Sequence, residues 1–242
     1  RHSLRGLGRT PWFTSLAVIT LALGIGANTA LFSLVSAVLL RFLPFPGVER
    51  LVILEATHPR RGPTSIGPDD FRDWREQNTV FDAMAYTMPS QANFTGQSFP
   101  DFAGPERLTG TEVSEGFFEL LGVQPLLGRW FRPEEQQPGR NRVLILSYRT
   151  WVRRFGARPD ILGQSLTLDG HSYTVVGVMP EDFRFNEGHV PEYWIPLAHQ
   201  ASGRLVHQYR GYARLKPGVP VEAAQAQLSA IARRLEEAYP ET

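Results

Sequence analysis

The chain has 242 residues, of which 42% are hydrophobic and 20% charged, so it can form one large or two modest folded domains and is not disordered. It contains no cysteine, which excludes disulfide bonds, zinc thiolate sites and a cysteine nucleophile. Four of its 25 basic residues and none of its 24 acidic ones precede residue 44, so the remainder carries a net charge of −3. Because that remainder has no basic stripe, we expect no nucleic-acid partner.

Residues 10–40 form an uncharged run of 31 positions, whereas a membrane-spanning helix needs about 20. The run predicts a transmembrane helix, which makes up an N-terminal segment at 1–43 together with the residues before it. Two alternatives stay open. A cleaved secretory signal has an apolar region of about 7–15 residues, shorter than this run. A buried helix of a soluble protein is rarely so long and so apolar on every side.

Basic and aromatic residues flank the start of this run. Arg5 and Arg9 precede it, and Trp12 stands where an aromatic residue of the membrane interface would lie. By the positive-inside rule, the arginines predict a cytoplasmic N-terminus in the plasma (inner) membrane. The residues after Arg41 would then form a periplasmic or extracellular domain.

Small residues interrupt the apolar run in the stretch ALGIGANTALF at 22–32. A dinucleotide-binding loop needs a third glycine after a strand, and a Walker-type loop needs Lys and then Ser or Thr after its last glycine; this stretch has neither. We therefore interpret Gly24, Gly26, Ala27 and Asn28 as a face that packs against another transmembrane helix, because small side chains let helices approach and an amide is costly in lipid. Packing alone and a part in a moving interface both stay open for them.

The first part of the outer region, after Pro44 and Pro46, combines strands with a helix. Residues 51–57 are predicted to form a strand, and we expect a second strand at 85–95. Between them, an amphipathic helix is predicted from Pro68 onward with a break near Asn78. Its apolar face comprises Phe71, Trp74, Phe81 and Met84.

The middle of the chain is rich in short strands. Its clearest signal is residues 165–179, where two strand-like runs flank Asp169-Gly170, a pair typical of a tight hairpin turn. Further strands are expected at 106–114, 142–147 and 192–197, and short helices that end in glycine at 115–122 and 148–156.

A strand and a long helix close the chain. Residues 209–216 alternate as a strand, and a helix opens at Pro220. We expect its apolar face to pack onto a sheet; a coiled-coil seam is the weaker alternative. This face comprises Val221, Ala224, Leu228, Ile231, Leu235 and Ala238.

The order of these elements predicts an α+β fold after the transmembrane helix, in which a small domain is split by a β-rich insertion. The first part of the split domain would span residues 44–104 and its second part residues 204–242. The inserted subdomain would span residues 105–203. The second part would lead toward a second transmembrane helix.

The residues that could carry chemistry are scattered along the chain. Asp69/Asp70 and Glu134/Glu135 are adjacent pairs, so their side chains do not face each other and are better suited to helix N-termini. The six histidines show no metal-ligand spacing, and His171 should be exposed beside the hairpin turn. We therefore expect no catalytic, cofactor-binding or metal site, and no enzyme.

Two further groups of residues have simple structural interpretations. Arg153 and Arg154 read as the solvated face of a short helix. The spacing of four tryptophans favours core anchors over a platform on which bases stack: Trp74, Trp130, Trp151 and Trp194.

An ordered series of stretches runs through nearly the whole chain. It starts with LALGIGANTALFSLVSAVLLR and a proline-rich exit, and continues with DFRDWREQNTVFDAMAY, VSEGFFELLGVQPLLGRWF, RVLILSYRTWVRRFG, LGQSLTLDGHSYTVVGVMPEDFRF and ARLKPGVPVEAAQAQLSAIARRLEEAYPET. No single stretch is decisive. In this order they resemble the first span and the extracytoplasmic core domain of the MacB-type (FtsX-like) ABC transporter permeases.

This resemblance implies a porter-like α+β part, made from both ends of the outer segment, with a β-rich part inserted. It also implies a permease dimer that transmits motion driven by a cytoplasmic ATPase to the outer domain, for export or efflux. Since no ATPase domain precedes the first span, the ATP-binding subunit would be a separate chain or would have been lost. A periplasmic adaptor protein would be a further partner.

The alternative function is a membrane-anchored extracytoplasmic binding module without transport activity. It predicts a single span, whereas the permease predicts three further apolar runs after Thr242. An anchored hydrolase is a third hypothesis, for which the chain offers no catalytic motif.

Overall fold

The computed structural model describes residues 46–58, 62–95, 105–185, 190–198 and 208–239, which belong to one compact unit, Pro44–Thr242. The predicted transmembrane helix and all residues proposed for it lie outside the described residues. Within those ranges, no helix is long and apolar enough to cross a membrane.

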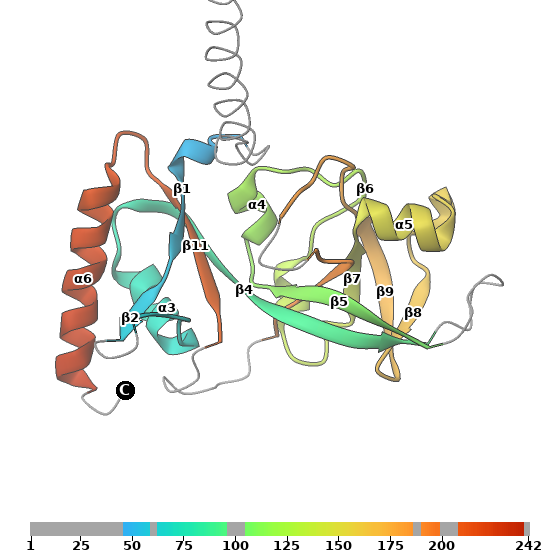
Figure 1. Ribbon diagram of the computed structural model, residues 1–242, viewed down its shortest axis with the longest axis horizontal. Coiled ribbons are helices and arrows are strands. Elements are labelled where there is room, and N and C mark those ends of the chain that lie inside the picture. Colours follow the sequence, from blue (N-terminus) through green and yellow to red (C-terminus); the bar gives the residue numbers. More distant parts are fainter. Residues whose placement is uncertain (1–45, 59–61, 96–104, 186–189, 199–207, 240–242) are drawn as a thin grey trace, which may run out of the picture. The chain divides into compact units, whose positions relative to one another are not determined.

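The two ends of the described chain build a layer of three strands covered by two helices (Figure 1). β1 (Leu51–Leu54) follows a short 3-10 turn at Val48–Arg50 and pairs with β11 (Arg210–Leu215), which pairs with the first half of β4 (Phe81–Phe94); both pairings are antiparallel. A core cluster joins this layer to α3 (Pro68–Gln77) and α6 (Val221–Ala238). Beside β1, β2 (Ala56–His58) and β3 (Gly62–Thr64) form a separate two-stranded sheet.

The helix α3 ends earlier than its apolar pattern predicts, which corrects the expectation for Phe81 and Met84. The side-chain amide of Asn78 donates to the carbonyl oxygens of Trp74 and Arg75, and its Oδ1 accepts from the backbone N–H of Phe81. These bonds terminate the helix and open a strand, so Phe81 and Met84 are buried from β4. The predicted break at Asn78 is confirmed, and the second strand begins four residues earlier than expected.

The second half of β4 belongs to a closed ring of six strands. β4 pairs with β5 (Glu106–Val113), and the ring continues through β10 (Tyr193–Pro196), β7 (Val143–Leu146) and β9 (His171–Val178) to β8 (Ser165–Leu168), which returns to β4. β6 (Leu127–Gly128) adds to the outer edge of β9. Side chains from all six strands fill the ring in one core cluster.

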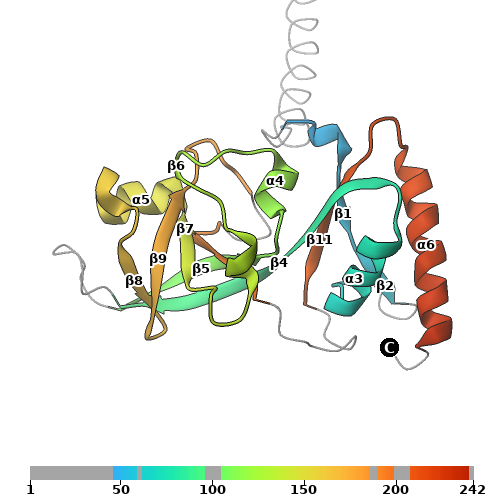
Figure 2. The ribbon, with the colours of Figure 1, turned by 180° about the vertical axis from the view of Figure 1, so that it is seen from behind.

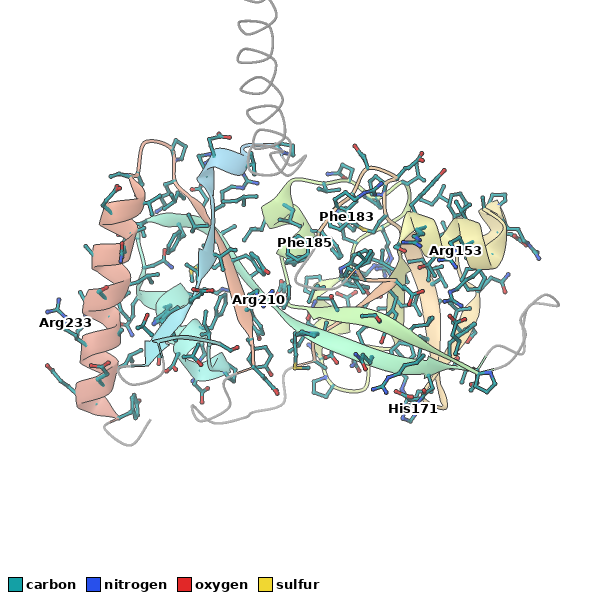
Figure 3. All side chains as sticks on the ribbon, viewed as in Figure 1. Arg153, His171, Phe183, Phe185, Arg210 and Arg233 are labelled. Atoms are coloured by element: carbon teal, nitrogen blue, oxygen red, sulfur yellow. The ribbon has the colours of Figure 1, made fainter. Side chains whose placement is uncertain are left out.

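Two short helices cover the ends and faces of this sheet. α5 (Tyr148–Phe155) places Trp151 and Phe155 in the ring core, and Ser147 caps its first turn by accepting from the N–H of Thr150. α4 (Phe117–Leu121) packs on the opposite face of the sheet with an aromatic cluster that includes Phe183 and Phe185 (Figure 3). The remaining 3-10 turns are Pro133–Gln136 and Pro159–Ile161.

The hairpin predicted at Asp169-Gly170 is confirmed. Both residues have positive φ, 47° and 74°, as the tightest two-residue hairpin turn requires. His171 is exposed at the tip of this hairpin, as expected (Figure 3).

These elements confirm the α+β class. The division into residues 44–104, 105–203 and 204–242 stays a prediction. β4 is continuous, however, pairing with β11 through residues 81–87 and with β5 through residues 87–94, so the two halves share one sheet (Figure 2).

Candidate functional site

The chain enters the described domain through a tight connection at Pro46 and Gly47. Gly47 has a φ of 65°, and its carbonyl oxygen accepts from the N–H of Arg50, which closes the short turn before β1. Pro46 lies against Gly122 at the end of α4. A Cβ at Gly122 would be 3.6 Å from the Cδ of Pro46, which is ordinary van der Waals contact. The first described residues therefore contact both the three-stranded layer and the helix on the sheet's opposite face.

Arg214 ties these parts together. Its Nη1 donates to the carbonyl oxygens of Pro46 and Gly47 at 2.9 and 3.0 Å. Its Nε and Nη2 both donate to the carbonyl oxygen of Leu120, at 3.0 and 2.6 Å. One guanidinium on β11 thus bonds the entering chain and α4, which lie more than seventy residues apart in sequence. We call this group, Arg214 with Pro46, Gly47 and Leu120, the Arg214 junction.

The last turn of α4 makes this contact physically favourable. The final carbonyls of a helix have no partner within the helix. Here the N–H of Gly122 bonds to the carbonyls of Glu119 and Phe118, while Leu120 accepts from Arg214. The planar arginine fork can hold several carbonyls in fixed directions at once, which a lysine cannot do.

Backbone carbonyl dipoles stabilise the charge of Arg214, and Arg214 forms no ion pair among the described residues. Burial lowers the pKa of this guanidinium, and the nearby charge of Arg50 lowers it further. Arg50 itself bonds to Asp82 and to the carbonyl of Leu215. The two arginines therefore brace the start of β1 against β4 and β11.

Sequence reasoning missed Arg214, although the pattern contains a signal for it. Tyr212 and Arg214 are two positions apart in β11 and therefore lie on the same face of the strand. Tyr212 is buried in the core cluster that contains α4. An arginine at the next position on the same face stands where an apolar residue would ordinarily pack. What it binds could not be read from the strand, because its partners come from other parts of the chain.

Groups suited to catalysis stay dispersed in the described part of the chain. No cluster of three or more metal-ligating side chains occurs there. Asp69 and Asp70 lie in the first turn of α3, and Glu134 and Glu135 in the first turn after Pro133, as predicted. The membrane residues Gly24, Gly26, Ala27 and Asn28, with Arg5, Arg9 and Trp12, lie outside the described residues and stay predictions.

One half-buried carboxyl has a perturbed pKa. Burial raises the pKa of Glu112 on β5, and a hydrogen bond from Ser90 lowers it in part. The Ser90 hydroxyl also lies 3.4 Å from that of Tyr193. These three residues come from neighbouring strands β4, β5 and β10, so the group connects strands and has no second carboxylate facing it among the described residues.

Comparison with known proteins identifies the sequence pattern. The profile of the MacB-like periplasmic core domain family matches residues 14–231. A macrolide export ATP-binding/permease protein, MacB of Burkholderia thailandensis, is 29% identical over 123 residues, which cover 49% of this chain and 18% of that protein. The chain therefore spans less than a fifth of the length of this relative.

Solved structures share the fold. The periplasmic region of MacB from Actinobacillus actinomycetemcomitans superposes with a TM-score of 0.55 at 15% identity, over 77% of this chain and 84% of that one. The extracellular domain of the noncanonic ABC-type transporter YknZ from Gram-positive bacteria gives 0.54 at 15% identity, over 79% and 94%.

Proposed function

The chain belongs to the family of the MacB-like periplasmic core domain, and from this premise we propose that it is part of the permease subunit of an ABC transporter. The family profile, which covers residues 14–231, is the observation that carries the proposal. The named relative from Burkholderia thailandensis is itself a permease fused to an ATP-binding part. In the proposed assembly, the permease is a dimer in the plasma (inner) membrane, with a separate ATP-binding subunit and a periplasmic adaptor protein.

The described domain would receive motion from the membrane and not perform chemistry. Transmission needs an element that joins the moving segment to the domain and that has two arrangements biased by the nucleotide state. The Arg214 junction supplies the joining element. A displacement of Pro46 and Gly47 acts on β11 and on the end of α4 together, because one guanidinium is bonded to all of them.

Spin labels test this role in the intact protein reconstituted with its ATP-binding subunit. The chain contains no cysteine, so labels at Glu49 and Glu119, both exposed, report the distance between the entering chain and α4. We expect one narrow distance distribution with and without ATP. In Arg214→Ala, the Glu49–Glu119 distance distribution should broaden. A second distance, between the two Glu119 labels of the dimer, should change with ATP in the unsubstituted protein. This change should vanish in Arg214→Ala while ATP hydrolysis continues.

Arg233→Ala is the control, since this exposed arginine lies on α6 away from the Arg214 junction (Figure 3) and bonds only to the carbonyl of Ser229 within its own helix among the described contacts. It should leave both distances unchanged. Arg214→Lys should give a Glu49–Glu119 distance distribution of intermediate width, because a lysine keeps the positive charge but lacks the planar fork of donors. An ATP-dependent change at Glu119 that persists in Arg214→Ala contradicts the role of the junction, and failure of any ATP-binding subunit to copurify contradicts the permease.

A further inference from the structure

A small pocket of about 200 Å³ opens beside the ring of strands, between α5 and the residues that lead into β10. Thr150 and Pro191, both buried, form its floor. Arg154 and Glu192 form one wall, where an ion pair of 2.9 Å joins them. The pocket lies outside the Arg214 junction, and the proposed function uses none of its residues.

Two further arginines line this pocket, Arg149 and Arg153, which lie one turn apart on α5 (Figure 3). Both are exposed, and neither side chain forms a hydrogen bond or an ion pair within the part of the chain that the structure describes. The carboxylates of Glu106 and Glu192 both bind Arg154 instead. The hydrogen bond from Arg154 lowers the pKa of Glu106 most, and Arg153 contributes only through its charge. Two positive charges of the pocket are therefore not neutralised by contact with a described carboxylate.

The stability of α5 does not account for Arg149. This residue lies in the first turn, which contains no acidic residue, and a positive charge is unfavourable at the positive end of the helix dipole. Arg153 follows four positions later, a spacing at which like charges repel each other. Both effects destabilise the helix. An anion bound beside the two guanidinium groups would offset both.

The hydroxyls of Ser147 and Thr150 add a third donor to the pocket. The Oγ of Ser147 accepts from the backbone N–H of Thr150, and the two hydroxyl oxygens lie 2.7 Å apart. One hydroxyl donates to the other, so the second hydroxyl hydrogen has no acceptor among the described residues. Both residues line the pocket, so an acceptor that binds there can take this hydrogen.

The geometry points to a binding site for a carboxylate, the side chain of a glutamate or aspartate on another protein. The polar side-chain groups that remain available in the pocket are donors, and a carboxylate offers only acceptors. The planar forks of Arg149 and Arg153 suit its two oxygens, and the free hydroxyl supplies one more hydrogen bond.

The size and the rim of the pocket favour a side chain over a free small molecule. Sites for small molecules usually measure about 300–1,000 Å³, so this pocket is too small for most of them. Val190 at its rim is 62% exposed, and Val152, on the same side of α5 as Arg149 and Arg153, is 38% exposed. Apolar area beside arginine is typical of protein interfaces. The inference rests on this pocket alone and holds whether or not the protein transports anything.

Arginine footprinting of the intact protein in detergent tests the inference. Phenylglyoxal modifies accessible guanidinium groups, and mass spectrometry locates the modified residues. The probe is a short capped peptide with one glutamate between leucines, and its control is the same peptide with glutamine. The glutamate peptide should slow the modification of Arg149 and Arg153 about twofold at a concentration equal to its Kd, and the glutamine peptide should not. Arg142, exposed before β7 and outside the pocket, should react equally in all samples.

Substitutions give a second measurement. Arg149→Ala and Arg153→Ala should each raise the Kd of the glutamate peptide at least about tenfold, because each removes charge-assisted hydrogen bonds. Arg142→Ala should leave the Kd unchanged. Arg149→Ala should also keep or raise the thermal unfolding midpoint, because it removes the repulsion within α5. A purely structural role of Arg149 predicts a lower midpoint.

Four other outcomes overturn the inference. Equal protection by the glutamate and glutamine peptides would show that the charge is not recognised, and no protection would show that no carboxylate binds. Protection by acetate or inorganic phosphate at the same concentrations as the peptide would show a site for free anions. Binding that appears only after Glu187→Gln would show that a carboxylate of this chain fills the pocket.

Discussion

Arg154 shows how tertiary contacts change the interpretation of a single residue. Its sequence context predicts a solvated helix face together with Arg153, and this is correct for Arg153 only. The Arg154 side chain is 13% exposed and binds the carboxylates of Glu106 and Glu192, with its Nη2 at 2.7 and 2.9 Å from them. The hydrogen bond to Glu106 raises the pKa of Arg154, and the same bond lowers the pKa of Glu106.

The adjacent arginines give a matched pair of variants. Arg154→Ala should lower the free energy of unfolding by about 2 kcal/mol, because it removes charge-assisted hydrogen bonds that join α5 to the start of β5 and to the residue before β10. Arg153→Ala should change it by less than about 0.5 kcal/mol, as is usual for an exposed side chain. Urea unfolding of both variants measures the difference. Equal effects would mean that the Arg154 contacts contribute nothing beyond helix propensity.

At the scale of elements, the ring of six strands is joined by the fewest register pairs at the seam between β8 and β4. The two strands share one register pair, Phe94 with Leu168. The turn residue Asp169 reinforces the seam: its Oδ1 accepts from the backbone N–H and from the amide of Asn93, both at 2.9 Å, and its own N–H donates to the Asn93 carbonyl. The hairpin turn therefore also closes the ring of six strands.

Substitution of Asp169 should open this seam. Asp169→Ala removes two hydrogen bonds to the Asp169 Oδ1 and a residue that tolerates positive φ. We therefore expect the free energy of unfolding to fall by about 2 kcal/mol. The backbone amides of Thr95 and of residue 169 should exchange faster. Asp169→Asn keeps an Oδ1 acceptor and the tolerance for positive φ, and should retain most of the stability. If Asp169→Asn proved as destabilised as Asp169→Ala, the contacts to Asn93 would not hold the seam.

The elements also show how far sequence reasoning reaches. Local signals located the hairpin at Asp169-Gly170, the helix ends at Gly122 and Gly156, and the break at Asn78, since each is set by a few neighbouring residues. The ring closure and the Arg214 junction escaped it, because both depend on pairs of residues distant in sequence. The residues proposed for the membrane were predicted from composition alone and stay predictions.

At the scale of the whole domain, β4 makes two cores parts of one structure. Its first half contributes Phe81, Met84 and Tyr86 to the core under α3 and α6, and its second half contributes Ala92 and Phe94 to the core of the ring. Between these halves, Thr87 pairs with both Arg210 and Val113. Because β4 contributes side chains to both cores, the unfolding of one core should also disrupt the other.

We therefore expect the domain to unfold in a single transition. Trp74 reports on the core under α6 and Trp151 on the ring core, so fluorine NMR of 5-fluorotryptophan-labelled protein follows the two separately. Their urea midpoints should coincide. Phe94→Ala, which empties part of the ring core at a cost of about 3–5 kcal/mol, should shift both midpoints equally. A shift confined to Trp151 would instead show two independent folding units and would favour the division of the chain at residues 104–105 and 203–204.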